Sequence, residues 1–248
     1  MADYQDLEGK VVCITGGANG IGAAMVRAFH AQGAFVSFCD IDAEAGKKLA
    51  KEIGPGVEFK KVDLLKQKQV VRWIEGVGQS YGALHVLVNN AASDPRIPLA
   101  DMSVEDWDTL LGRNLRSCFL TSQAAAPLMK QGASIINFSS ITFHIAPAEM
   151  TAYVASKGGI LSFSKSLARE LGPKRIRVNT ISPGWIMTER QKEQFVTPAV
   201  KRMLRKAQCV PDLIQPVEIA NVALFLASET SSAITGQEIL ADRGWAHS

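Results

Sequence analysis

Short, β-rich apolar runs alternate with longer helical stretches along most of this chain of 248 residues. The runs are mostly apolar on both faces, as expected of strands that helices cover from above and below. Alternation of this kind predicts an α/β fold with a parallel, doubly wound sheet and right-handed crossovers. The predicted strands are 11–14, 34–39, 57–62, 84–88, 134–138, 177–181 and 238–240, and the predicted helices are 20–32, 43–53, 66–80, 104–130, 151–171 and 216–227.

The chain has no internal repeat, low-complexity tract or linker, so residues 1–248 are expected to form a single domain. One segment, residues 185–215, interrupts the alternation between the sixth strand and the next helix. An insertion of this length inside a compact domain is usually functional. We expect it to form a lid over a binding site.

Composition and charge exclude several classes of protein. Hydrophobic residues make up 47% of the chain and charged residues 21%, a globular rather than a disordered balance. The net charge of +3 is too small to imply nucleic-acid binding. The four cysteines are widely spaced, which argues against a disulfide framework or a metal site. Without a signal peptide or a long apolar run, the protein is expected to be soluble and cytoplasmic, with no membrane partner.

The first predicted strand runs into a glycine-rich turn, TGGANGIG at residues 15–22, which a helical pattern follows at once. Glycines let a backbone approach a pyrophosphate closely, and the helix N-terminus offers it free N–H groups. The spacing G-x-x-x-G-x-G differs from the G-x-G-x-x-G dinucleotide fingerprint, and a tight strand-to-helix connection is the alternative. The position after the first strand of an alternating chain favours dinucleotide binding.

Asp40 ends the second predicted strand, 20 residues after Gly20. A carboxylate there can accept hydrogen bonds from the adenosine ribose hydroxyls and repels a 2′-phosphate. Neither Asn19 nor Ile41 supplies a compensating cation. NAD is therefore the expected cofactor rather than NADP, and a solvated aspartate at a strand end is the alternative.

Tyr153 and Lys157 stand four residues apart, on one face of a predicted helix. An ammonium near a phenol stabilises the phenolate and lowers the phenol pKa, as a general base requires. Such a pair alone is common on solvated helices. Ser140 closes a strand thirteen residues earlier, where ligands bind in open α/β sheets, with Ser139 as the competing serine.

Together these pieces resemble the short-chain dehydrogenase/reductase family over essentially the whole chain. The matching motifs are TGGANGIG at 15–22, Asp63, NNA at 89–91, Asn114, Ser140, YVASK at 153–157 and SPGWIMT at 182–188. The resemblance implies a seven-stranded Rossmann sheet and a homotetramer. The sequence departs from the family pattern at Ala92 and at Arg243, where glycines are usual.

The resemblance also implies the roles of individual residues. Tyr153 would take the hydroxyl proton of the substrate, Lys157 would lower the tyrosine pKa and hold the nicotinamide ribose, and Ser140 would bond the substrate oxygen. Asn114 would keep a water in the proton relay, and Asn89 would shape the backbone beside the cofactor. The residues expected at the NAD site are Gly16, Asn19, Gly20, Ile21, Gly22, Asp40, Ile41, Asp63, Leu64, Asn90, Tyr153, Lys157, Pro183, Gly184, Ile186 and Thr188.

Residues 93–96, 141–144 and 189–191 and the closing Gly244-Trp245 resemble bacterial sugar 1-dehydrogenases of the D-xylose dehydrogenase type. Polar groups at these positions suit a substrate with several hydroxyls, whereas a lipid pocket would be mostly apolar. We therefore expect oxidation of an aldose at C1 to its lactone. The expected substrate contacts are Asp94, Arg96, Ser140, His144, Tyr153 and Gln191, of which Asp94, Arg96, His144 and Gln191 have a purely structural loop role as the alternative.

Besides NAD-dependent oxidation of another polyol, a hydroxy acid or a secondary alcohol, three other interpretations stay open. Basic residues outnumber acidic ones between residues 189 and 206, which either attracts an anionic substrate such as a sugar acid or forms a solvated helical face. Reduction of a carbonyl in lipid metabolism is a second interpretation, which Asp40 disfavours because many such relatives use NADPH. A non-catalytic NAD-binding protein is a third, and the presence of the tyrosine, lysine and serine argues against it.

Overall fold

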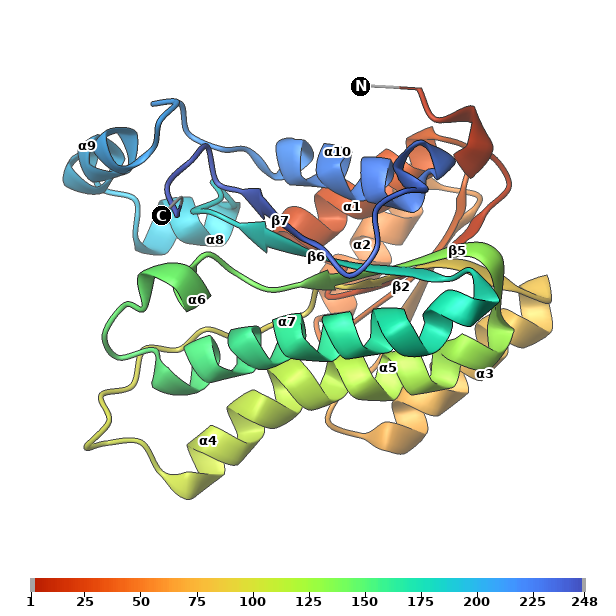
Figure 1. Cartoon of the computed structure of the whole chain (residues 1–248), viewed down its shortest axis with the longest axis horizontal. Coiled ribbons are helices and arrows are strands. Elements are labelled where there is room, and N and C mark those ends of the chain that lie inside the picture. Colours follow the sequence, from red (N-terminus) through yellow and green to blue (C-terminus); the bar gives the residue numbers. More distant parts are fainter. Residues whose placement is uncertain (1–2, 247–248) are drawn as a thin grey trace.

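The computed structural model describes residues 3–246, which form a parallel sheet of seven strands in the order β3-β2-β1-β4-β5-β6-β7 (Figure 1). The chain runs outward from β1 to β3 and then returns to start again at β4. The predicted doubly wound sheet is confirmed. The strands are β1 (Val11–Thr15), β2 (Phe35–Asp40), β3 (Val57–Lys61), β4 (Leu84–Asn89), β5 (Met129–Phe138), β6 (Arg177–Pro183) and β7 (Glu238–Ala241).

Helices cover both faces of the sheet (Figure 1). On one face lie α1, α2 and α10, and on the other lie α3, α5 and α7. The longer helices are α1 (Gly20–Ala31), α2 (Ala43–Ile53), α3 (Gln67–Tyr81), α4 (Val104–Leu111), α5 (Ser117–Ala125), α7 (Thr151–Leu171), α9 (Pro198–Ala207) and α10 (Pro216–Ala227). Within residues 3–246, none of these helices combines the length and the apolar character needed to cross a bilayer.

The alternation of side chains along each strand creates two separate cores. In β1, Val12 and Ile14 pack on the α1 and α10 side, whereas Val11 and Cys13 pack on the α3 and α5 side. Every residue of β1 is buried, which explains why its sequence is apolar on both faces. The edge strand β3 instead exposes Glu58 on one side.

The predicted helix over residues 104–130 is wrong in two respects. Between α4 and α5 the chain forms a π-helical turn, Gly112–Arg116, which contains Asn114. A π turn inserts one extra residue into the helical repeat and is frequent at functional sites. Beyond α5, a short 3-10 turn ends at Leu128 and strand β5 begins at Met129.

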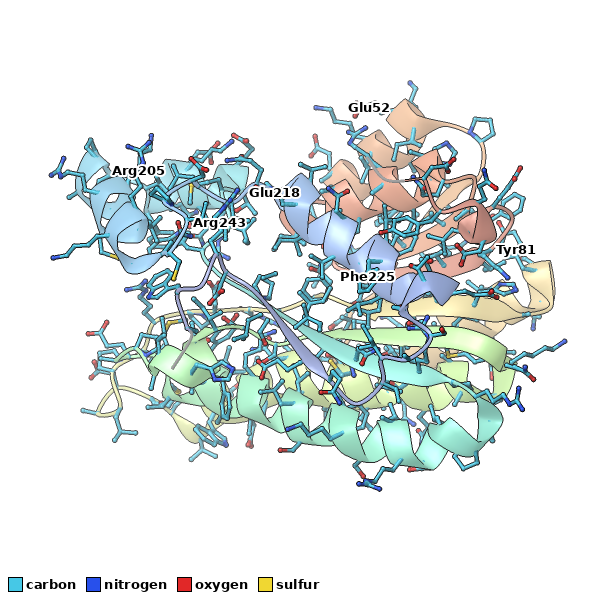
Figure 2. All side chains as sticks on the ribbon, turned by 45° about the horizontal axis from the view of Figure 1, so that its top comes forward. Glu52, Tyr81, Arg205, Glu218, Phe225 and Arg243 are labelled. Carbon is cyan, nitrogen blue, oxygen red and sulfur yellow. The ribbon has the colours of Figure 1, made fainter. Side chains whose placement is uncertain are left out.

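Residues 185–215, the predicted lid, contain two helices, α8 (Glu189–Gln194) and α9, that project beyond the sheet (Figure 1). The segment begins and ends side by side, because Ile186 forms a parallel bridge with Ile214. The exposed face of α9 carries Arg205, which Figure 2 shows pointing outward. Close to the lid, Arg243 forms an ion pair with Glu218 of α10 at 2.7 Å (Figure 2).

Candidate active site

A large cavity opens at the carboxyl edge of the sheet, beside the point where the strand order reverses between β1 and β4. Its volume is about 1070 Å³, at the upper end of the range for small-molecule sites. The lining comes from the ends of the strands, the start of α1, the helix α7, the lid and the turn after β7. This is where open α/β sheets bind their ligands.

The glycine-rich turn forms one end of the cavity and has no room for side chains. Gly16 and Gly20 have φ values of +65° and +54°, which glycine adopts without strain. A Cβ atom on Gly22 would lie 1.9 Å from the carbonyl oxygen of Gly16. Asn19 precedes α1, but its side chain does not accept a hydrogen bond from the helix N-terminus. The first backbone N–H groups of α1 therefore lack a side-chain cap and face the cavity. This turn fits a pyrophosphate group.

Asp40 lies beside this turn and is fixed by the backbone. Its carboxylate accepts hydrogen bonds from the N–H groups of Ala18 (3.0 Å) and Asp42 (3.1 Å). Asp42 caps α2 and accepts a hydrogen bond from Asn19 at 3.2 Å, so two carboxylates stand at this end. The cations that line the cavity come from other segments, namely Arg96, Arg113, Lys157 and Arg190.

The other residues predicted at the cofactor site also line the cavity: Ile21, Ile41, Asp63, Leu64, Asn90, Pro183, Gly184, Ile186 and Thr188. The amide of Asn90 donates to the carbonyl oxygens of Thr15 and Gly16, which ties the end of β4 to the glycine-rich turn. Asn89 is buried behind this layer and donates to Asn137 at 2.9 Å. The structure thus brings the predicted cofactor set together.

Tyr153 and Lys157 of α7 lie deep in the cavity. The Lys157 ammonium is 2% exposed, donates to the Phe138 carbonyl oxygen at 2.7 Å and lies 5.4 Å from the centroid of the Tyr153 ring. Burial lowers the pKa of Lys157 to about 8. Burial raises the pKa of the Tyr153 phenol well above its usual range, and the Asp94 carboxylate adds to that rise.

The pKa of Tyr153 is therefore raised, whereas a neighbouring ammonium such as that of Lys157 was expected to lower it. A hydrogen bond with Ser140 and the positive charge of Arg190 lower the phenol pKa, but burial outweighs them. Positive charge near the phenol therefore acts against the effect of burial on the Tyr153 pKa.

The structure distinguishes the two candidate serines. Ser139 donates to the carbonyl oxygen of Lys157 at 2.9 Å, so its hydroxyl is committed to holding β5 against α7. Ser140 instead hydrogen-bonds the Tyr153 phenol and accepts from the Thr142 N–H. Of the two serines, Ser140 is the one whose hydroxyl contacts the Tyr153 phenol.

Asn114 is fully buried and does not line the cavity. Its side-chain oxygen accepts from the Ser93 N–H at 2.8 Å, and its amide donates to the Ser93 carbonyl oxygen at 2.9 Å. The amide also donates to the Ser156 hydroxyl on α7 at 3.2 Å. The side chain of Asn114 therefore anchors the loop after β4 to the helix that carries Tyr153.

Asp94 and Arg96 line the cavity, as predicted, but both are engaged with the lid. Asp94 forms an ion pair with Arg190 of α8 at 2.8 Å. The Arg96 guanidinium lies over the Phe195 ring, 5.9 Å from its centroid. From the sequence, Asp94 and Arg96 were expected to contact the substrate as polar loop residues. In the structure, both side chains contact the lid.

His144 does not line the cavity, so its position does not support the predicted contact with a substrate. The short helix α6 (Thr142–Ile145) directs the imidazole toward β7, where Nε2 lies 2.8 Å from the Glu238 carboxylate. Ser182 donates to the same carboxylate oxygen. Gln191 does line the cavity, and the Thr188 hydroxyl accepts from its N–H group at 3.3 Å.

Sequence reasoning missed Arg113, and it gave Trp185, Arg190, Glu193, Met203 and Trp245 only as parts of the lid or of segments expected around the substrate. All six line the cavity. Trp245 is held by the turn after β7, where the Asp242 carboxylate accepts from the N–H groups of Gly244 and Ala246. Trp185 and Trp245 fall inside motifs that the sequence already singled out. Their direction toward the cavity could not be read from those motifs.

Comparison with known proteins agrees with this geometry. The family model described as enoyl-(acyl carrier protein) reductase matches residues 16–246. The chain is 41% identical to the protein named "Probable galactose dehydrogenase GalD" of Rhizobium meliloti, over 98% of this chain and 97% of that protein. It is also 41% identical to the D-xylose 1-dehydrogenase of Caulobacter vibrioides, over 98% of each chain.

More distant relatives have other substrates in their names. The 3-oxoacyl-[acyl-carrier-protein] reductase of Thermotoga maritima is 39% identical over 96% of this chain and 98% of that protein. A crystal structure of a short-chain dehydrogenase/reductase from Brucella melitensis, titled glucose/ribitol dehydrogenase, is 29% identical, superposes with a TM-score of 0.94 and covers all of both chains. The chain belongs to the short-chain dehydrogenase/reductase family and is an oxidoreductase that acts on CH–OH groups with NAD(P).

Proposed function

We propose that this enzyme is an NAD-dependent dehydrogenase that oxidises C1 of an aldose to the lactone. The observation that carries the proposal is the grouping of Tyr153, Ser140 and Lys157 across one cavity from the glycine-rich turn. Bound NAD supplies the acceptor for the hydride that leaves C1. Ser140 bonds the C1 oxygen, and Tyr153 takes its proton as the C–O bond gains double-bond character.

The preference for NAD rests on charge at the adenosine end of the cavity. Asp40 and Asp42 stand there together, and a 2′-phosphate would have to approach both carboxylates. The cavity cations lie elsewhere, at Arg96, Arg113, Lys157 and Arg190. Like charges this close disfavour NADP and leave NAD as the expected cofactor.

The preference for a neutral, hydroxyl-rich substrate rests on the lid. Its excess of basic residues belongs mostly to the exposed face of α9, whereas the lid residues that line the cavity are Trp185, Ile186, Thr188, Glu189, Arg190, Gln191, Glu193 and Met203. Arg190 is already paired with Asp94. No unpaired lid cation among the described lining residues remains to select a sugar acid, which favours the solvated-face interpretation. The two sugar dehydrogenases at 41% identity support the same substrate class.

The test is a rate comparison for the purified enzyme with NAD and a panel of substrates. The panel holds D-xylose, D-galactose, D-glucose, simple secondary alcohols and, in the reverse direction, acetoacetyl-coenzyme A. We expect kcat/KM for at least one aldose to exceed that of the secondary alcohols by about tenfold or more. Failure to oxidise any aldose would overturn the proposal. Efficient reduction of the acyl substrate would instead place the enzyme with its 3-oxoacyl reductase relatives.

We also propose that the enzyme assembles as a homotetramer. Two separate parts of the surface expose large apolar side chains: Val104, Trp107 and Phe119 on α4 and α5, and Val217 and Leu240 on α10 and the edge strand β7. Two self-complementary faces build a tetramer, whereas one builds a dimer. Light scattering during gel filtration should give four times the chain mass of 26.8 kDa. A monomer mass would contradict the assignment of both faces.

A further inference from the structure

The loop that follows β4 is rigid at its base and attached to the lid at its tip. Asn114 holds Ser93 through two hydrogen bonds. At the next residue, Asp94 forms a 2.8 Å ion pair with Arg190, which is on the lid helix α8. The loop therefore belongs to the body of the protein, and the ion pair spans the boundary between the body and the lid.

The same ion pair lies beside the phenol of Tyr153. Asp94, Arg190 and Tyr153 all line the same cavity. The Asp94 carboxylate opposes formation of a phenolate, and the Arg190 guanidinium favours it, so the two act on Tyr153 in opposite directions. While the pair is formed, the Arg190 guanidinium offsets part of the effect of Asp94 on the phenol.

Displacement of the lid would change this balance. Arg190 lies within the lid, whose two ends the Ile186–Ile214 bridge joins to each other, whereas Asp94 is on the anchored loop. If α8 moves away, Arg190 leaves and the negative charge of Asp94 stays beside the phenol. We propose that the Asp94–Arg190 pair is an electrostatic switch that makes Tyr153 competent to accept a proton only while the lid is closed. This inference rests on the proposed role of Tyr153 as the general base.

Other charged groups face the same region, but most do not belong to the lid. Lys157 is on α7 with Tyr153 itself, and Arg113 is on the π turn. These two cations keep their places whatever the lid does. The charged groups that line this end of the cavity, together with Cys118 beside Lys157, are Asp94, Arg96, Arg113, Cys118, Lys157, Glu189, Arg190 and Glu193. Within this set, the Asp94 carboxylate raises the pKa of the Tyr153 phenol and the Arg190 guanidinium lowers it.

The experiment measures kcat/KM against pH for oxidation of D-xylose and D-galactose by NAD, for the parent enzyme and three charge variants. Arg190→Gln leaves Asp94 unpaired and should move the ascending limb of the profile, which reports loss of the Tyr153 proton, up by about 0.5 to 1 pH unit. Asp94→Asn should move it down by a similar amount. The double variant should return close to the parent. Both shifts should shrink in about 1 M salt, because the pair is partly exposed to solvent.

Two controls separate charge from structure. Arg190→Lys keeps the positive charge and should keep the parent profile. Phe195→Leu weakens the other contact between the loop and the lid, the one with Arg96, but leaves every charge and the Asp94–Arg190 pair in place, and should give no shift in the profile. Shifts of Arg190→Gln and Asp94→Asn in the same direction, or no shift in either, would overturn the switch while leaving the proposed function intact. A Tyr153→Phe variant as active as the parent would instead overturn the proposed function.

Discussion

Replacing Lys157 by methionine should stabilise the fold near neutral pH while destroying activity. Burial lowers the pKa of Lys157 from 10.5 to about 8. Each pKa unit corresponds to about 1.4 kcal/mol, so keeping this ammonium charged at about pH 7 costs the folded state about 3 kcal/mol. The Lys157→Met variant would avoid that cost but would lose the hydrogen bond to the Phe138 carbonyl oxygen, about 1–2 kcal/mol. The expected net gain is about 1–2 kcal/mol.

The gain should depend on pH in a defined direction. Below about pH 8 both the folded and unfolded parent chains hold the lysine proton, so the penalty is complete. Between about 8 and 10.5 the folded parent releases the proton that the unfolded chain still binds, and the stability of the parent rises with pH. The advantage of the variant should therefore fall by about 3 kcal/mol from about pH 7 to 10.5 and become a disadvantage.

The assay is urea unfolding followed by the fluorescence of the four tryptophans, at one fixed protein concentration and a series of pH values. Lys165→Met, on the exposed side of the same helix, is the matched control, and its stability difference from the parent should stay constant. A stability difference for Lys157→Met that did not change across this pH range would refute the claim that the active site holds a buried, charged ammonium.

Three further variants test other parts of the site. Asp40→Ala should raise the ratio of NADP to NAD efficiency by about tenfold or more, and an unchanged ratio would refute the role of this carboxylate. Gly22→Ala would place a methyl group against the Gly16 carbonyl oxygen, so urea unfolding should show a loss of about 1–3 kcal/mol and calorimetry should show weakened NAD binding. Asn114→Ala should cost about 1–3 kcal/mol because it leaves the Ser93 backbone groups without partners; parent-like stability and kcat would show that the loop does not need this anchor.

Much of the fold follows from sequence pattern alone. Strands such as Val11–Thr15 are buried on both faces, so their apolar runs are unambiguous. The π turn at Gly112–Arg116 was missed because the chain stays helical through it, so residue type alone shows no break. The start of β5 at Met129 was missed because Pro127, in the 3-10 turn between α5 and β5, was not taken as the end of the helix.

The cofactor end of the site was predictable because its chemistry is fixed by the backbone and by residue order. The glycine-rich turn must follow β1, and Asp40 must end β2. At the substrate end, a polar loop residue can contact either a ligand or another loop. The sequence alone does not distinguish these two cases. Asp94 turned toward Arg190 on a segment 96 residues away, and His144 turned toward Glu238, for reasons that only tertiary packing supplies.

The most direct test of the account compares Tyr153→Phe with the parent enzyme in two measurements on the same preparation. Calorimetry should show NAD binding of similar strength in both, because the glycine-rich turn and Asp40 are untouched. Formation of NADH from the best aldose should fall by about 10²–10⁴-fold, the usual contribution of a general base. Turnover by the variant within about twofold of the parent, with NAD bound equally well, would show that the phenol does not carry the proton.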